Sequence, residues 1–172
     1  ALAMEGKEAV RGFYVYGCNP ANTVSDQQLI IRGLEREDLF TVVHERFMTD
    51  TARYADIVLP ATFSVEQTDI YRAYGYCTLS TGRKLVDAPG ECRSNWDTFC
   101  LLAKGMGYAD DYFDRSENEM LDILLSHPTR AIAETSDEAK KTLRQGGSIA
   151  LPFSDHLAFG TETGKMLIVN EK

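Results

Sequence analysis

Short apolar runs alternate with helix-forming stretches between residues 12 and 60, and this alternation restricts the fold more than any other feature of the chain. The candidate strands, residues 13–16, 39–43 and 56–59, are rich in the β-branched and aromatic residues that strands favour. Strand and helix alternating in this way are typical of half a doubly wound sheet, with consecutive strands parallel and adjacent. The sequence therefore predicts an α/β fold: a three-layer Rossmann-like domain with a mainly parallel sheet.

Helix-start signals support this alternation. Ser25 followed by Gln28 is a capping box, which predicts a helix after the first strand. Thr49 or Asp50 can cap a short helix that runs through Tyr54 after the second strand.

The pattern changes after residue 60. Residues 61–91 predict a long loop or an irregular hairpin. Three helices are predicted next. The first starts near Asn95, and capping boxes start the other two, at Ser116 with Glu119 and at Thr135 with Glu138. Gly146-Gly147 ends the third helix. The chain reads as extended from Ser148, with a final strand over residues 166–169. We therefore expect an α/β domain over residues 1–147 (core 12–110) and an extended linker over 148–172 toward a C-terminal domain.

Composition excludes several classes of protein. The chain has 172 residues, and its 18 Lys and Arg against 26 Asp and Glu give a net charge of -8. This charge argues against a general nucleic-acid binder and against an anionic membrane surface as a partner. No apolar run approaches the ~20 residues that span a bilayer, and no signal peptide is visible. The start at Ala1 is interpreted as an excised internal piece, although removal of an initiator Met would look the same.

The four cysteines have no zinc-binding or redox spacing. Cys18, Cys77, Cys92 and Cys100 are interpreted as reduced, buried thiols that act as small apolar fillers. Two disulfides in a secreted protein are the alternative that the count of cysteines leaves open.

Ligand sites in doubly wound sheets lie beyond the carboxyl ends of the strands, which places the first candidate at residues 17–21. Gly17 allows close approach of the backbone to a ligand, and the helix start at Asn19-Pro20 would offer free N–H groups to a phosphate. The alternative is an ordinary Asn-Pro turn.

His44 and Glu45 end the second strand and form the next candidate. A carboxylate at this position can accept two hydrogen bonds from the vicinal hydroxyls of a ribose. A solvated carboxylate is the alternative for Glu45, and a structural role is the more frequent one for a lone histidine such as His44.

Three further polar residues complete the candidate site. Thr49 and Asp50 would face a polar ligand or simply cap the short helix, and Glu66 would face the site or lie at the surface. We find no Ser/His/Asp constellation, no phosphate-binding P-loop and no metal-binding helix in the sequence. No catalytic and no metal-ligating residue is therefore predicted, and the residues alone indicate a nucleotide-type ligand domain.

A long motif carries a family resemblance. Its densest part reads Asp38-Leu39-Phe40-x-Val42-Val43-His44-Glu45-x-Phe47-x-Thr49-Asp50-Thr51-Ala52-x-Tyr54-Ala55-Asp56-Ile57-Val58-Leu59-Pro60-Ala61-Thr62. Flanking matches are Gly17-x-Asn19-Pro20-Ala21, Gly33-Leu34-x-Arg36-Glu37, Glu66, Asp69-x-Tyr71-x-x-Tyr74-Gly75 and Pro89-Gly90-Glu91-x-x-Ser94-Asn95-Trp96. With these residues the chain resembles the dimethyl-sulfoxide-reductase superfamily, whose members are molybdenum or tungsten oxidoreductases with a bis-molybdopterin guanine dinucleotide cofactor (bis-MGD).

The resemblance implies that the chain is an internal fragment corresponding to the third, α/β domain of such an enzyme, where one guanine dinucleotide is bound. It matches Asn19 to the turn near the cofactor, Glu45 to a ribose ligand, Thr49 to a polar position on the same nucleotide, and Glu66 to a segment toward the pterin. The full set of predicted cofactor-binding residues is Asn19, Pro20, His44, Glu45, Thr49, Asp50 and Glu66.

The resemblance also implies what lies outside the chain. The protein ligand of the metal and any iron–sulfur cysteines lie upstream in the family, and a further domain lies downstream. The chain departs from the family pattern in two places. Residues 161–165 read Thr-Glu-Thr-Gly-Lys where the family usually has Thr-Pro-Ser-Gly-Lys. Cys18 and Cys92 stand where relatives often have small residues such as Ser or Ala. The implied partners are the other domains of the parent enzyme and its electron-transfer subunits, with neither nucleic acid nor membrane insertion.

Two other interpretations stay open. One is a homologous scaffold subunit of an electron-transfer complex that kept the fold and lost the cofactor. The other is a nucleotide-binding domain of another class, such as the middle domain of a thiamine-diphosphate enzyme. The substrate and the choice between molybdenum and tungsten are left open, as is the compartment, with the cytoplasm favoured over the periplasm.

Overall fold

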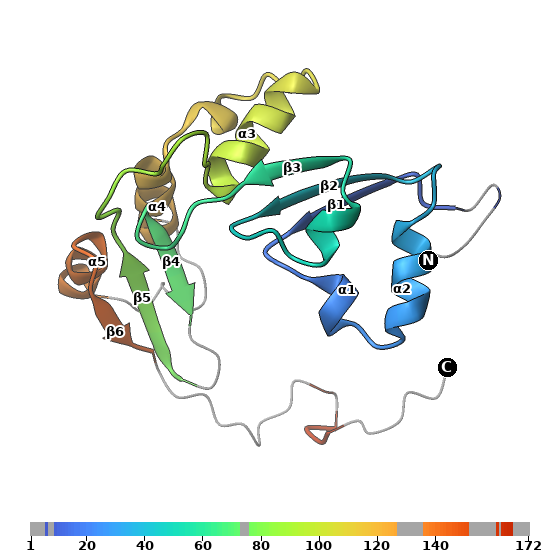
Figure 1. The fold of residues 1–172 in the computed structure, drawn as a ribbon. Coiled ribbons are helices and arrows are strands. Elements are labelled where there is room, and N and C mark those ends of the chain that lie inside the picture. The colour runs from blue at the N-terminus through green and yellow to red at the C-terminus, as the bar shows by residue number, and fades with distance from the viewer. Residues whose placement is uncertain are drawn as a thin grey trace.

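A parallel sheet forms the first part of the molecule (Figure 1). The computed structural model describes residues 6, 9–72, 76–126, 136–151, 161 and 163–166. The sheet has the order β1-β2-β3, made of β1 (Gly12–Tyr16), β2 (Phe40–Glu45) and β3 (Ile57–Pro60). Both pairings are parallel, with Val43 opposite Val15 on one side and opposite Val58 on the other. The predicted α/β fold with adjacent parallel strands is therefore confirmed.

Helices cover both faces of this sheet (Figure 1). One face carries α1 (Pro20–Thr23), α2 (Gln27–Leu34) and the 3-10 helix η2 (Thr51–Tyr54), and the other carries α3 (Asn95–Gly105). Val15, Val43 and Ala52 form the core under η2. On the opposite face, the rings of Tyr14 and Tyr16 lie 5.4 and 5.2 Å from the ring of Phe99 in α3. The arrangement has the three layers that the sequence predicts.

A second, antiparallel sheet packs against the last two helices. Its order is β4-β5-β6, made of β4 (Asp69–Arg72), β5 (Thr78–Gly82) and β6 (Ser148–Ala150). The 3-10 helix η3 (Asp111–Asp114) precedes α4 (Glu117–Ser126) and α5 (Asp137–Arg144). Buried leucines from this sheet and both α-helices form its core: Leu79, Leu121, Leu125 and Leu143.

The second sheet modifies two expectations. The hairpin expected within residues 61–91 is present as β4 and β5. Residues 148–150, expected to begin an extended linker, instead pair with β5, because an apolar Ile149 can add to the leucine core there. Most of the remaining tail, including residues 167–169 of the expected final strand, lies outside the described residues.

The predicted caps of α2 and α5 differ in detail, and one of the two residues predicted to cap η2 does so. The cap of α2 is Asp26 rather than Ser25, with φ +59° and its carboxylate accepting from the Leu29 N–H at 3.3 Å. At η2, the Ala52 N–H donates to the Thr49 hydroxyl at 3.2 Å, whereas Asp50 makes no side-chain cap. The cap of α5 is Ser136, and Thr135 lies outside the described residues. α2 and α5 each begin one residue after the expected place, because the residue that caps each of them lies one position further along.

The capping box at the start of α4 is confirmed and predicts a pH-dependent stability. The Ser116 N–H donates to the Glu119 carboxylate at 2.7 Å, and the Glu119 N–H donates to the Ser116 hydroxyl at 3.3 Å. The bonds from Ser116 favour the ionised carboxylate and lower the pKa of Glu119. Because the pKa is lower in the folded chain than in the unfolded chain, this stabilisation is present at neutral pH and is lost as the pH falls through the folded pKa.

We therefore expect Glu119→Gln to lower the melting temperature near pH 7 and to differ less from the wild type below about pH 4. Thermal unfolding followed by circular dichroism at several pH values measures the difference. Glu138→Gln is the control, since Glu138 lies in the first turn of α5 and its side chain forms no hydrogen bond with the described residues. A Glu119→Gln difference that does not change with pH would contradict the expectation.

Candidate functional site

The loops that follow β1 and β2 meet at the carboxyl edge of the parallel sheet. Gly17, which directly follows β1, has φ +56° and donates its N–H to the His44 carbonyl at 3.3 Å. A Cβ added at Gly17 would meet no atom within 4 Å, so the space beside this turn is open. This edge is where parallel α/β sheets bind ligands.

Asn19 and Thr51 join the two loops directly. The N–H and the hydroxyl of Thr51 both donate to Asn19 Oδ1, at 3.1 and 2.8 Å. The structure therefore brings Asn19 beside the segment that follows β2, at the edge of the sheet that the sequence predicted from strand order. Thr51 itself was missed, because a threonine inside a short helix carries no signal of a contact 32 residues away.

The N–H groups in the first turn of α1 are already hydrogen-bonded within the protein. Ala21 donates to the Thr51 hydroxyl at 3.0 Å, Asn22 and Thr23 both donate to the Asn19 carbonyl at 3.0 Å, and Pro20 has no N–H. The expectation that this helix start offers free N–H groups to a phosphate is therefore wrong.

Other backbone donors remain beside it. Among the described residues, the N–H groups of Cys18 and Asn19 have no hydrogen-bond partner. The donors available to an anion therefore lie in the turn before α1 and not in the helix.

Glu45 is placed on the η2 face of the sheet. Its neighbour two residues before, Val43, packs against Ala52 of η2, and alternate residues of a strand share a face. Glu45 Oε1 accepts from the Arg46 N–H at 2.7 Å. Oε1 also forms an ion pair with the Arg46 guanidinium at 3.6 Å, and the Glu45 side chain is 8% exposed. Oε2 has no partner among the residues that the structure describes and is not fully buried, so it can accept from a ligand through this small opening.

His44 lies on the opposite face from Glu45. Its ring is 1% exposed, with Nε2 at 3.2 Å from the Arg93 carbonyl and at 3.4 Å from the Thr98 hydroxyl of α3. The two neighbouring residues therefore cannot meet the same ligand atoms. These contacts give Nε2 a structural partner, whereas the buried Nδ1 has no hydrogen-bond partner among the described residues, and a role of His44 at a cofactor stays a prediction.

Thr49, Asp50 and Glu66 lie in turns close to this edge. Thr49 caps η2, and Asp50 is exposed. The Glu66 carboxylate accepts from the Phe63 N–H at 2.8 Å. The Phe63 ring lies 5.4 Å from that of Phe47, so the loop of Glu66 lies beside the segment that follows β2.

The cysteines and the metal-binding residue types form no further site. All four cysteines are free; Cys100 is buried, and burial raises the pKa of its thiol, whereas Cys18 is exposed and is therefore not an apolar filler. No group of three or more His, Cys, Asp or Glu within the described residues is placed to hold a metal ion. In the same part of the chain, no helix has the length and apolarity needed to cross a membrane.

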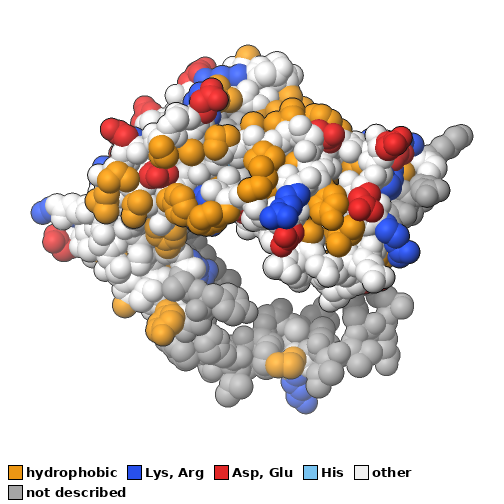
Figure 2. Space-filling view, in the orientation of Figure 1, with side chains coloured by type: hydrophobic (Ala, Val, Ile, Leu, Met, Phe, Trp, Pro, Cys, Tyr) orange, Lys and Arg blue, Asp and Glu red, His pale blue; other side chains and the backbone are white. Residues whose placement is uncertain are grey.

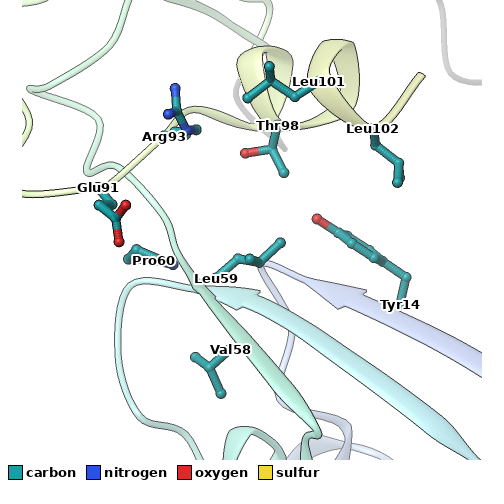
Figure 3. A pocket seen from close by; sticks show the side chains of 9 residues that line it. All are labelled: Tyr14, Val58, Leu59, Pro60, Glu91, Arg93, Thr98, Leu101 and Leu102. Atoms are coloured by element: carbon teal, nitrogen blue, oxygen red, sulfur yellow. The ribbon is translucent and has the colours of Figure 1, made fainter. Parts of the chain in front are cut away.

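A cavity of about 440 Å³ lies between β3 and α3, on the face of the sheet opposite Glu45, and reaches Pro60 at the carboxyl end of β3 (Figure 3). Its walls combine aliphatic side chains, among them Leu59, Leu101 and Leu102, with the charged Glu91 and Arg93. The Tyr14 hydroxyl points into it, is buried, and has no hydrogen-bond partner within the described residues; burial raises the pKa of Tyr14. None of the predicted cofactor-binding residues lines this cavity.

Known proteins match the chain over most of its length. Residues 1–105 match the family described as molybdopterin oxidoreductase. The probable oxidoreductase YoaE of Bacillus subtilis (strain 168) is 41% identical over 127 residues, which are 74% of this chain and 19% of that protein. The dimethyl sulfoxide/trimethylamine N-oxide reductase of Rhodobacter capsulatus is 36% identical over 115 residues, 64% of this chain and 14% of that protein.

A solved structure agrees with the fold. Acetylene hydratase from Pelobacter acetylenicus aligns with a TM-score of 0.71 and 23% identity over 95% of this chain and 22% of its own length. The chain thus spans about a fifth or less of the length of these relatives.

Proposed function

The chain belongs to the molybdopterin oxidoreductase family, and from this we propose that it is one segment of a molybdenum or tungsten oxidoreductase and binds one guanine dinucleotide of bis-MGD. The observation that carries the proposal is the junction of Asn19 and Thr51 at the carboxyl edge of the sheet. It joins two loops whose remaining polar groups suit a nucleotide.

The chemistry of these groups fits a pyrophosphate and a ribose. The N–H groups of Cys18 and Asn19 are donors without partners among the described residues, beside a glycine turn with open space. Donors of this kind suit phosphate oxygens. The Glu45 carboxylate has one oxygen available to accept from ribose hydroxyls. The loop after β1 thus offers N–H donors for the pyrophosphate, and the end of β2 offers a carboxylate oxygen for the ribose hydroxyls of a nucleotide.

The residues of this chain would act by holding and orienting the cofactor. The metal–pterin group supplies the two-electron chemistry when it is bound. Cys18 and Asn19 would hold the phosphates, Glu45 the ribose, and Thr49 and Asp50 would border the same nucleotide. The chain by itself would then show no turnover.

Exposed apolar side chains support a larger parent protein. Figure 2 shows hydrophobic side chains gathered in several patches on one face. Phe47 and Met48 beside the site are 64% and 65% exposed, and Leu101 on α3 is 50% exposed. Patches of this kind are typical of interfaces. We propose that they meet the other domains of the parent enzyme, which would include any iron–sulfur domain and contact the electron-transfer subunits.

Glu45→Ala in the protein encoded by the complete reading frame tests the proposal. Bis-MGD is one cofactor with two guanine dinucleotides, so we expect the variant to lose the whole cofactor on dialysis, guanine nucleotide and metal together, at least about tenfold faster than the wild type, because a hydrogen bond to a charged group is lost. GMP released by acid hydrolysis and molybdenum or tungsten by mass spectrometry, each per polypeptide, measure the retention. Glu37→Ala is the control, since Glu37 is exposed in the turn before β2.

The outcomes separate the candidate functions. Equal GMP in the wild type and in Glu45→Ala would count against Glu45 as the ribose ligand. A wild-type protein without GMP and without metal would overturn the proposal and favour the cofactor-free scaffold subunit, which has the same fold.

A further inference from the structure

We propose that Thr51 is a positioning residue for the nucleotide, acting through Asn19; the inference rests on the proposed function above. Thr51 is 0% exposed and therefore cannot contact a ligand at the surface. Its effect on a ligand must pass through the groups that it holds.

Thr51 uses each of its polar groups except its carbonyl to fix the loop after β1. Its N–H and hydroxyl donate to Asn19 Oδ1 at 3.1 and 2.8 Å, and the hydroxyl oxygen accepts from the Ala21 N–H at 3.0 Å. One buried side chain of η2 therefore holds both the residue before α1 and the first turn of α1. Buried, fully paired contacts of this kind restrict a loop to one conformation.

These contacts also determine how the Asn19 amide is turned. A backbone N–H can only donate, so the Asn19 atom that faces the Thr51 N–H must be the carbonyl oxygen. The amide nitrogen is thereby directed away from Thr51 and has no partner among the described residues. Thr51 thus keeps the Asn19 NH₂ group, together with the Cys18 and Asn19 N–H groups, available as donors before the nucleotide binds. Such preorganisation raises affinity because less ordering remains to be done on binding.

Thr41 of β2 is a matched reference for Thr51 of η2. It is also 0% exposed, but its hydroxyl oxygen has no hydrogen-bond partner among the described residues. Replacing Thr41 by valine removes the same atoms from an equally buried position without removing a bond to Asn19.

The test compares Thr51→Val, Thr51→Ser and Thr41→Val in the protein encoded by the complete reading frame. Each variant is checked for folding by circular dichroism, and GMP retained per polypeptide is measured after dialysis, as for Glu45. Thr51→Val keeps the backbone N–H bond to Asn19 but loses both hydroxyl bonds, to Asn19 and to Ala21. We expect it to lose GMP on dialysis at least about tenfold faster than the wild type, since even one lost hydrogen bond of 1.4 kcal/mol is worth tenfold in affinity. Thr51→Ser keeps the hydroxyl and is expected to restore retention to within about twofold, and Thr41→Val to retain GMP like the wild type.

If Thr51→Val retains as much GMP as Thr41→Val, the positioning role is overturned, while the proposed function stays in place. A wild type that holds no GMP would overturn the proposed function and with it this inference. If Thr51→Val does not fold, Thr51→Cys replaces it, because a thiol is a weak hydrogen-bond donor of similar size. Thr51→Ser is then expected to retain more GMP than Thr51→Cys, and equal retention would overturn the proposal.

Discussion

Asn19→Asp is expected to abolish most nucleotide retention while leaving the fold intact. The new carboxylate still accepts both hydrogen bonds from Thr51, so the junction of the two loops is kept. The variant loses the NH₂ donor and places a negative charge beside the proposed pyrophosphate. Loss of a hydrogen bond to a charged group costs roughly 1.5–3 kcal/mol, or about 10- to 100-fold in affinity, and charge repulsion adds to it. GMP retained per polypeptide by the protein from the complete reading frame measures the loss.

Asn22→Asp is the matched control for this charge. Asn22 lies three residues further along and is exposed on α1, so the same charge is added beside the site without changing Asn19. Wild-type retention in Asn19→Asp, or an equal loss in both variants, would show that the Asn19 amide has no specific part in binding.

Leu125→Ala is expected to have the largest effect on stability. Leu125 is 0% exposed and belongs to the core that joins α4 and α5 to the antiparallel sheet. Truncating such a leucine removes its buried apolar surface and leaves a cavity, which costs about 2–5 kcal/mol. That is a large share of the roughly 5–15 kcal/mol by which domains are stable. Chemical denaturation of the 172-residue chain followed by fluorescence of its single tryptophan, Trp96, measures the change.

Leu124→Ala is the control in the same turn of α4. Leu124 is 37% exposed, so the same truncation removes less buried surface and leaves a space open to solvent, and its cost is expected to be below about 1.5 kcal/mol. Equal destabilisation by the two substitutions would contradict the placement of Leu125 in the core.

The parallel sheet was predictable because its signal is local. β2 is the central strand and Val43 is 0% exposed, which fits the mostly apolar run of residues 39–43 that predicted the strand. The helix caps were predictable to within one residue, since a cap is read from the few residues around it. The edge of the sheet that carries Asn19 and Glu45 followed from strand direction alone, because parallel strands end on one side.

The partners of individual groups were not predictable. His44 and Glu45 are neighbours in sequence, yet strand alternation and the packing of α3 and η2 put them on opposite faces. β6 joins β5 from 66 or more residues away, so no local pattern distinguishes it from a linker. The N–H groups of α1 were expected to be free and are not, because Thr51 and Asn19 take them.

The sequence by itself determined the class of fold, the edge of the sheet that carries the candidate site, and the family, because each depends on residue order along one segment. Only the tertiary structure decided which polar groups at that edge are already bonded and which remain for a ligand. The physical reason is that a hydrogen bond such as that of Thr51 with Asn19 joins segments 32 residues apart, and its existence depends on how two loops pack and not on either loop alone.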